Sequence, residues 1–90
     1  MRATIWKFTL PLPAAIVSVM MPEGAEPLFV AEQFGVPCVW AMVTDTAAPL
    51  VEHRFRWVGT GHSIEDTGPY IGSWLSAGGA LVWHLFEAVR

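Results

Sequence analysis

Residues 51–58 constrain the fold more than any other part of this sequence, because their side chains alternate between two kinds. One set is apolar or aromatic and the other is charged: Val51, His53, Phe55 and Trp57 against Glu52, Arg54 and Arg56. A period of two is typical of a β-strand that buries one face and exposes the other. The strand runs straight into Gly59-Thr60-Gly61-His62, whose two glycines predict a turn.

Six other segments have the apolar and β-branched composition of strands, and turn residues separate them. They are residues 4–10, 16–21, 28–33, 36–43, 70–75 and 80–86. No segment keeps a helical period, although a single helical turn at residues 13–16 stays open as an alternative. We therefore predict one all-β domain over residues 1–90, an antiparallel β-sandwich or partly open barrel of about seven short strands.

The predicted core consists of large side chains on the inward faces of these strands. Its members are Trp6, Phe8, Val30, Trp40, Phe55, Trp57, Trp74 and Trp83. Phe34-Gly35 lies between two of the strands, at hairpin spacing. Because a bulky aromatic residue adopts positive φ poorly, we expect a bulged turn here rather than a type I′ turn.

The chain has more apolar residues than one small core can hide. Hydrophobic residues make up 53% of the sequence and charged residues only 14%, against about 25% charged in an average globular domain. Residues 38–43 are apolar on both faces of their strand, and such a strand is normally covered on both sides. We predict that a second copy of the chain supplies one cover and that the protein is a homo-oligomer.

The charge balance excludes several classes of partner. A net charge of −3 with scattered acidic residues argues against general nucleic-acid binding, which needs clustered Lys and Arg.

No run approaches the ~18 apolar residues of a membrane-spanning helix, so we expect no membrane association. Cys38 is the single cysteine, which excludes an internal disulfide. Its apolar surroundings predict a buried, unreactive thiol in a reducing cytoplasm.

The best candidate for a ligand or partner contact is the end of the central strand with its turn. The candidate residues are Arg54, Arg56, Gly59, Thr60, Gly61 and His62. In one interpretation, backbone N–H groups of the turn converge on an anion while the arginines bind a phosphate or carboxylate. The other is a tight turn that needs positive φ at both glycines, with His62 only capping it. A lone Gly-x-Gly favours the tight turn.

Catalysis and metal binding find little support in the sequence. The three histidines, His53, His62 and His84, lie in different segments and lack the close spacing of zinc ligands. Thr60 and Ser63 are near His62, but the chain has no Gly-x-Ser-x-Gly nucleophile turn. We therefore predict no catalytic residues, no metal and no cofactor. A metal-dependent or Thr/His enzyme is the least favoured hypothesis.

Several motifs resemble those of a family of small phage and prophage proteins of unassigned function. The matching segments cover nearly the whole chain and are Ile5-Trp6-Lys7, Met21-Pro22-Glu23-Gly24-Ala25, Pro37-Cys38-Val39-Trp40-Ala41, Gly59-Thr60-Gly61-His62, Tyr70-Ile71-Gly72 and residues 78–87. Phe34-Gly35 departs from the polar turn expected of that family. The resemblance implies a phage origin, an all-β fold, and action in the infected bacterium or in the virion. It implies no catalytic residues.

Three functional hypotheses follow from these patterns. We favour a non-catalytic binding protein that acts in the host bacterial cytoplasm and inhibits an antiviral defence. It would block a defence protein such as a CRISPR effector, or sequester a nucleotide signal between subunits with Arg54, Arg56 and the 59–62 turn. The alternative is a structural or accessory component of the virion. The third hypothesis is a metal-dependent or Thr/His enzyme.

Overall fold

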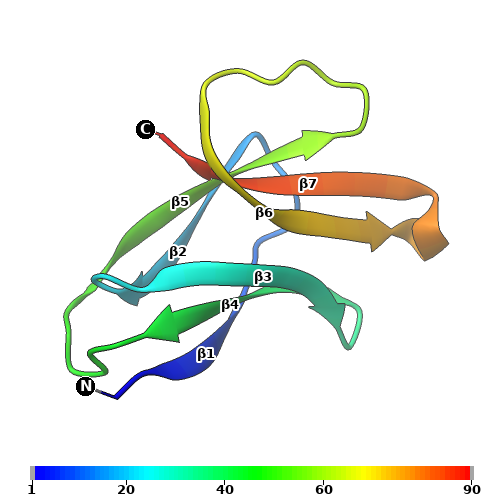
Figure 1. The fold of residues 1–90 in the computed structure, drawn as a ribbon. Coiled ribbons are helices and arrows are strands. Elements are labelled where there is room, and N and C mark those ends of the chain that lie inside the picture. Colours follow the sequence, from blue (N-terminus) through cyan, green and yellow to red (C-terminus); the bar gives the residue numbers. More distant parts are fainter. Residues whose placement is uncertain (1, 90) are drawn as a thin grey trace.

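The computed structural model describes residues 2–89 and shows seven β-strands in two antiparallel sheets (Figure 1). The strands are β1 (Thr4–Thr9), β2 (Ile16–Pro22), β3 (Glu26–Gln33), β4 (Val36–Val43), β5 (Leu50–Gly59), β6 (Thr67–Ser76) and β7 (Leu81–Ala88). One sheet has the strand order β1-β4-β3 and the other has the order β2-β5-β7-β6. The predicted all-β antiparallel fold is confirmed, and the two sheets form a sandwich rather than a closed barrel.

Strand β5 lies between β2 and β7 and carries the centre of the core. Phe55 is fully buried and Trp57 is 4% exposed, whereas Arg54 is exposed and Arg56 is half-buried on the opposite face. The alternation predicted for residues 51–58 is therefore confirmed. The apolar face of β5 points into the sandwich, where the three-stranded sheet covers it.

The two sheets approach each other most closely where β3 meets β6 (Figure 1). Trp74 Nε1 donates a hydrogen bond to Glu32 Oε1 over 3.0 Å. Gly72 lies against Val30, and a methyl group at Gly72 would come within 2.7 Å of Val30 Cγ1. Glycine at this position therefore allows β6 to pack directly on β3, which closes one side of the sandwich.

Most of the predicted core residues lie in the core or against it. Val30, Phe55, Trp57 and Trp74 are buried, and Trp6, Phe8 and Trp83 pack against the buried cluster. The prediction is wrong for Trp40, which lies on the outer face of the three-stranded sheet, 5.8 Å from Phe29 between ring centroids. Val39 and Ala41 on either side of it are fully buried. Because strand side chains alternate, Trp40 points outward.

Two turns bear on the sequence-based interpretation. The helical turn left open as an alternative at residues 13–16 does not form, and a short 3₁₀ turn lies at Ala77–Gly79. Phe34 and Gly35 have φ of 53° and 79° and form a two-residue loop between β3 and β4. Positive φ at both positions defines a type I′ turn, so the expectation of a bulged turn is wrong. Type I′ geometry matches the twist of the paired strands, which overrides the poor fit of Phe34.

No helix among residues 2–89 is long and apolar enough to cross a membrane.

Candidate ligand-binding site

The turn after β5 is a tight β-turn. His62 N–H donates to Gly59 O over 3.0 Å, and Thr60 N–H donates to Val82 O over 3.2 Å. These backbone bonds occupy two of the N–H groups that an anion nest would need. Gly61 has a φ of 87°, whereas Gly59 has no positive φ. The expected tight turn is therefore present, but the prediction of positive φ at both glycines is wrong, because only Gly61 has the left-handed conformation.

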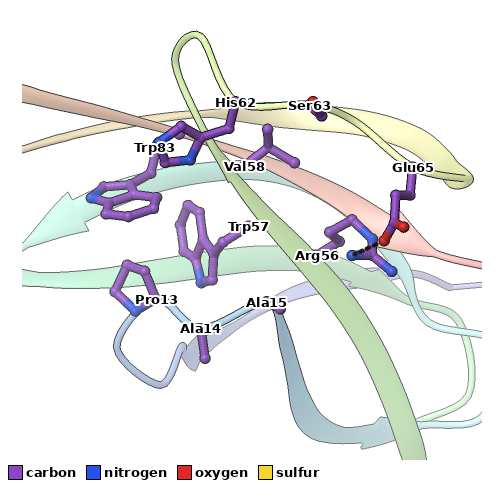
Figure 2. Close-up of a pocket in the computed structure, with 11 residues that line it drawn as sticks. Pro13, Ala14, Ala15, Arg56, Trp57, Val58, His62, Ser63, Glu65 and Trp83 are labelled. Carbon is purple, nitrogen blue, oxygen red and sulfur yellow. Dashed lines mark ion pairs between the residues drawn. The ribbon is translucent and has the colours of Figure 1, made fainter.

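Gly59 differs from Gly61 in that a side chain packs closely on its backbone. A methyl group at Gly59 would lie 2.9 Å from both Cε1 and Nδ1 of His62. The turn thus folds the imidazole of His62 back over the end of β5. Figure 2 shows this ring next to the indole of Trp83.

A pocket of about 420 Å³ opens at this end of β5 (Figure 2). Its lining comes from the β1–β2 loop, the end of β5, the following loop and β7, and consists of Pro13, Ala14, Ala15, Arg56, Trp57, Val58, Gly59, His62, Ser63, Glu65 and Trp83. The pairing of β2 with β5 ends at Ile16 and Arg56, whereas β5 continues to Gly59. The pocket lies beside this last part of β5, on the edge of the strand that β2 no longer pairs with.

Two buried polar atoms lack partners in residues that line the pocket. Arg56 Nε and Trp57 Nε1 are buried and have no hydrogen-bond partner among residues 2–89. One guanidinium nitrogen of Arg56, Nη1, lies 3.8 Å from Glu65 Oε1, and the Glu65 side chain is 82% exposed. That separation is too long for a hydrogen bond. Figure 2 shows the rings of Trp57, Trp83 and His62 at one end of the pocket, with Arg56 and Glu65 at the other.

The structure divides the predicted site residues into separate groups. Arg56, Gly59 and His62 line the pocket. Thr60 lies in an adjoining hollow of about 320 Å³, which shares Gly59, His62 and Trp83 with the pocket. Arg54 lies on the same face of β5 as Arg56 but lines a separate hollow, together with Glu52, Ala88 and Val89. Gly61 shapes the turn and lines neither cavity.

Sequence reasoning missed a chain of hydroxyl groups around His84. Tyr70 Oη contacts Ser73 Oγ, which lies 3.0 Å from His84 Nδ1, and His84 Nε2 lies 2.8 Å from Thr60 Oγ1. Thr60 Oγ1 itself donates to Val82 O. Which partner donates in the two bonds to the imidazole depends on which ring nitrogen carries the proton. The pairing of Ser73 with His84 across β6 and β7 creates this cluster.

Comparison with known proteins identifies a family. The sequence matches a domain of unknown function, DUF7352, over residues 1–90. No curated protein and no solved structure matches the chain. Because the family match extends over the full sequence, this chain belongs to the DUF7352 family.

Proposed function

We propose that this protein is a non-catalytic binding domain whose Arg56 pocket holds an anionic ligand with an aromatic ring, of the nucleotide class. The proposal rests chiefly on Arg56, which lines the pocket together with His62 and Trp83 and whose Nε has no hydrogen-bond partner among residues 2–89. Buried polar groups of native proteins are nearly always hydrogen-bonded. An anionic ligand in the pocket would pair with the accessible part of the Arg56 side chain, which is 20% exposed.

The guanidinium of Arg56 suits a phosphate. Its contact with Glu65 is a loose one to an exposed side chain, and exposed ion pairs of this kind contribute at most about 1 kcal/mol. A phosphate forms shorter, charge-assisted and often bidentate bonds with arginine. Phosphate oxygens therefore displace Glu65 at low cost.

The aromatic walls of the pocket suit a nucleobase. Trp83 and His62 line both the pocket and the adjoining hollow, and stacking of a base on an aromatic side chain is worth about 1–3 kcal/mol. The pocket volume of about 420 Å³ is within the range of about 300–1,000 Å³ that is common for small-molecule sites. The adjoining hollow leaves room for a second nucleotide unit.

Calorimetric titration with a panel of mononucleotides, linear and cyclic dinucleotides, nucleosides and inorganic phosphate tests the proposal. We expect a nucleotide to bind, and Arg56→Ala to weaken its binding at least tenfold. Arg54→Ala is the matched control, because Arg54 shares the strand face but not the pocket, and it should bind like the wild type. Absence of binding across the panel at millimolar concentration, or equal effects of the two variants, would refute the proposal.

For the biological role, we propose sequestration of a nucleotide signal in the host bacterial cytoplasm, which would inhibit an antiviral defence. Support comes from the resemblance of the sequence motifs to small phage and prophage proteins, together with the pocket. Expression in bacteria that carry a nucleotide-signalling defence should restore phage plaques, and the Arg56→Ala variant should not. If the wild type and the Arg56→Ala variant restored plaques equally, a contact with a host protein, and not the pocket, would be responsible.

A further inference from the structure

The charged side chains of the Arg56 pocket lie together at one of its ends. Figure 2 shows Arg56 and Glu65 there, and aromatic rings at the other end. Among residues 2–89, these two are the only Asp, Glu, Lys or Arg residues that line the pocket. A nucleotide whose base stacks on the aromatic rings therefore brings its first phosphate to Arg56.

A further hollow borders the pocket on the side of Arg56, and it is acidic. This acidic hollow has a volume of about 430 Å³ and shares Arg56 and Glu65 with the pocket, while Asp66 and Val89 complete its lining. Both carboxylates are on exposed residues. A chain of phosphates that continued outward past Arg56 would therefore enter a space with two negative charges and no second cation.

The other Lys and Arg residues of the described part of the chain lie elsewhere. Arg54 shares its own hollow with Glu52, and Arg2 lines a hollow beside Thr4 and Val43. Lys7 Nζ donates to Gln33 Oε1 over 2.6 Å on the other sheet. None of the three lines the pocket or the acidic hollow.

Backbone donors of the neighbouring turn do not replace the missing cations. The N–H groups of Thr60 and His62 donate to the carbonyl oxygens of Val82 and Gly59. The adjoining hollow, on the other side of His62, is lined by no Lys, Arg, Asp or Glu among residues 2–89. Arg56 is thus the one positive charge that the site offers to a phosphate.

We propose, on the basis of the nucleotide site proposed above, that the pocket selects nucleotides whose phosphate carries a single negative charge, which is the charge of a phosphodiester. One guanidinium balances one such charge. A phosphomonoester carries about −1.5 to −2 at pH 7, and the additional phosphates of a triphosphate would lie in the acidic hollow. The repulsion there is screened only in part, because the Debye length is about 8 Å at physiological ionic strength.

Two kinds of nucleotide have this chemistry. One is a 3′,5′-cyclic mononucleotide, whose phosphodiester closes a ring, and the other is a dinucleoside monophosphate, whose phosphodiester joins two nucleosides. Calorimetric titration compares both with the 5′-monophosphate and the 5′-triphosphate, first for adenosine and then for uridine. We expect each phosphodiester to bind at least tenfold more tightly than the triphosphate, with the monophosphate between them. Tighter binding of the cyclic form or of the dinucleoside form identifies the source.

Substitution of the two acidic residues tests the cause of the selection. Asp66→Asn is the sharper variant, because Asp66 forms no ion pair with residues 2–89 and acts through its charge alone. Asp66→Asn and Glu65→Gln should each lower the ratio of phosphodiester to triphosphate affinity at least threefold. Glu52→Gln is the matched control, since it removes the same charge from the hollow of Arg54, and it should leave the ratio unchanged.

The outcomes separate this selectivity from the nucleotide site itself. A triphosphate that binds as tightly as the phosphodiesters overturns the selectivity, and so does a ratio that neither acidic variant changes. In both cases binding that depends on Arg56 would still support the nucleotide site. If no nucleotide binds at all, the proposed function is refuted and the selectivity with it.

Discussion

The imidazole of His62 lies directly against the backbone of Gly59, so closely that a methyl group there would be 2.9 Å from Cε1 and Nδ1 of the ring. At Gly61, two residues later, an added methyl group would meet no atom within 4 Å, but the backbone φ is 87°. A methyl group would displace a side chain at the first glycine and strain the backbone at the second. The two positions therefore respond differently to the same substitution.

Gly59→Ala should displace the His62 ring and leave most of the stability intact, because His62 is an exposed side chain that can rotate away. We expect changed chemical shifts of the His62 ring and weaker nucleotide binding. Gly61→Ala should instead lower the free energy of unfolding by about 1 kcal/mol, because alanine is strained at positive φ. NMR spectra and urea unfolding of both variants check this contrast. Unchanged His62 shifts in Gly59→Ala would contradict the packing argument.

Glu32→Ala should destabilise the seam between β3 and β6. The change leaves the indole N–H of Trp74, a residue only 7% exposed, without its acceptor. The expected loss is about 1–2 kcal/mol in the free energy of unfolding. Glu32→Gln keeps an acceptor oxygen and should lose less than half as much. Urea unfolding measures both, with Glu23→Ala as a control on an exposed turn residue. Equal losses in the two Glu32 variants would show that charge, and not the hydrogen bond, is responsible.

Phe34→Asn should stabilise the protein. Phe34 is 94% exposed and has a φ of 53°, so the aromatic ring contributes little packing while the backbone is strained. Asparagine adopts this conformation more readily, and we expect a gain of about 0.5–1 kcal/mol. In a domain of this size 1 kcal/mol raises the Tm by about 4–8 °C. Calorimetry checks the rise, and Gly35→Ala in the same turn should lower the Tm. A lower Tm for Phe34→Asn would be evidence that the ring packs on a partner.

Local patterns were sufficient to predict the strands, because a period of two holds whichever strand lies alongside. Residues 51–58 had one charged and one apolar face, and their orientation was predicted correctly. Residues 38–43 were apolar on both faces, so no local pattern could place Trp40 inside or outside. Its orientation depends on the register of β4 with β1 and β3, which is a property of the whole sheet.

The candidate site was harder to predict than the fold for the same reason. Arg54 and Arg56 share a strand face, yet only Arg56 lines the pocket, because the pairing of β2 ends beside it. The hydroxyl cluster depends on the register of β6 with β7, which irregularities shift between Thr67 and Gly72. Sequence spacing alone therefore could not place Ser73 opposite His84.

The hydroxyl cluster around His84 gives a last prediction, which concerns the tautomer of its imidazole. A proton of Thr60 Oγ1 directed at Val82 O would leave this oxygen to accept from Nε2–H, so we expect the neutral imidazole to carry its proton on Nε2. ¹⁵N NMR of the ring should show a protonated Nε2 and an unprotonated Nδ1. Thr60→Val removes the acceptor of Nε2–H, and Ser73 can then accept from Nδ1–H, so the population should move towards that tautomer. Ser73→Ala should leave the wild-type tautomer in place. Protonation on Nδ1 in the wild-type protein would show that the hydrogen bonds run in the opposite direction, from His84 to Ser73.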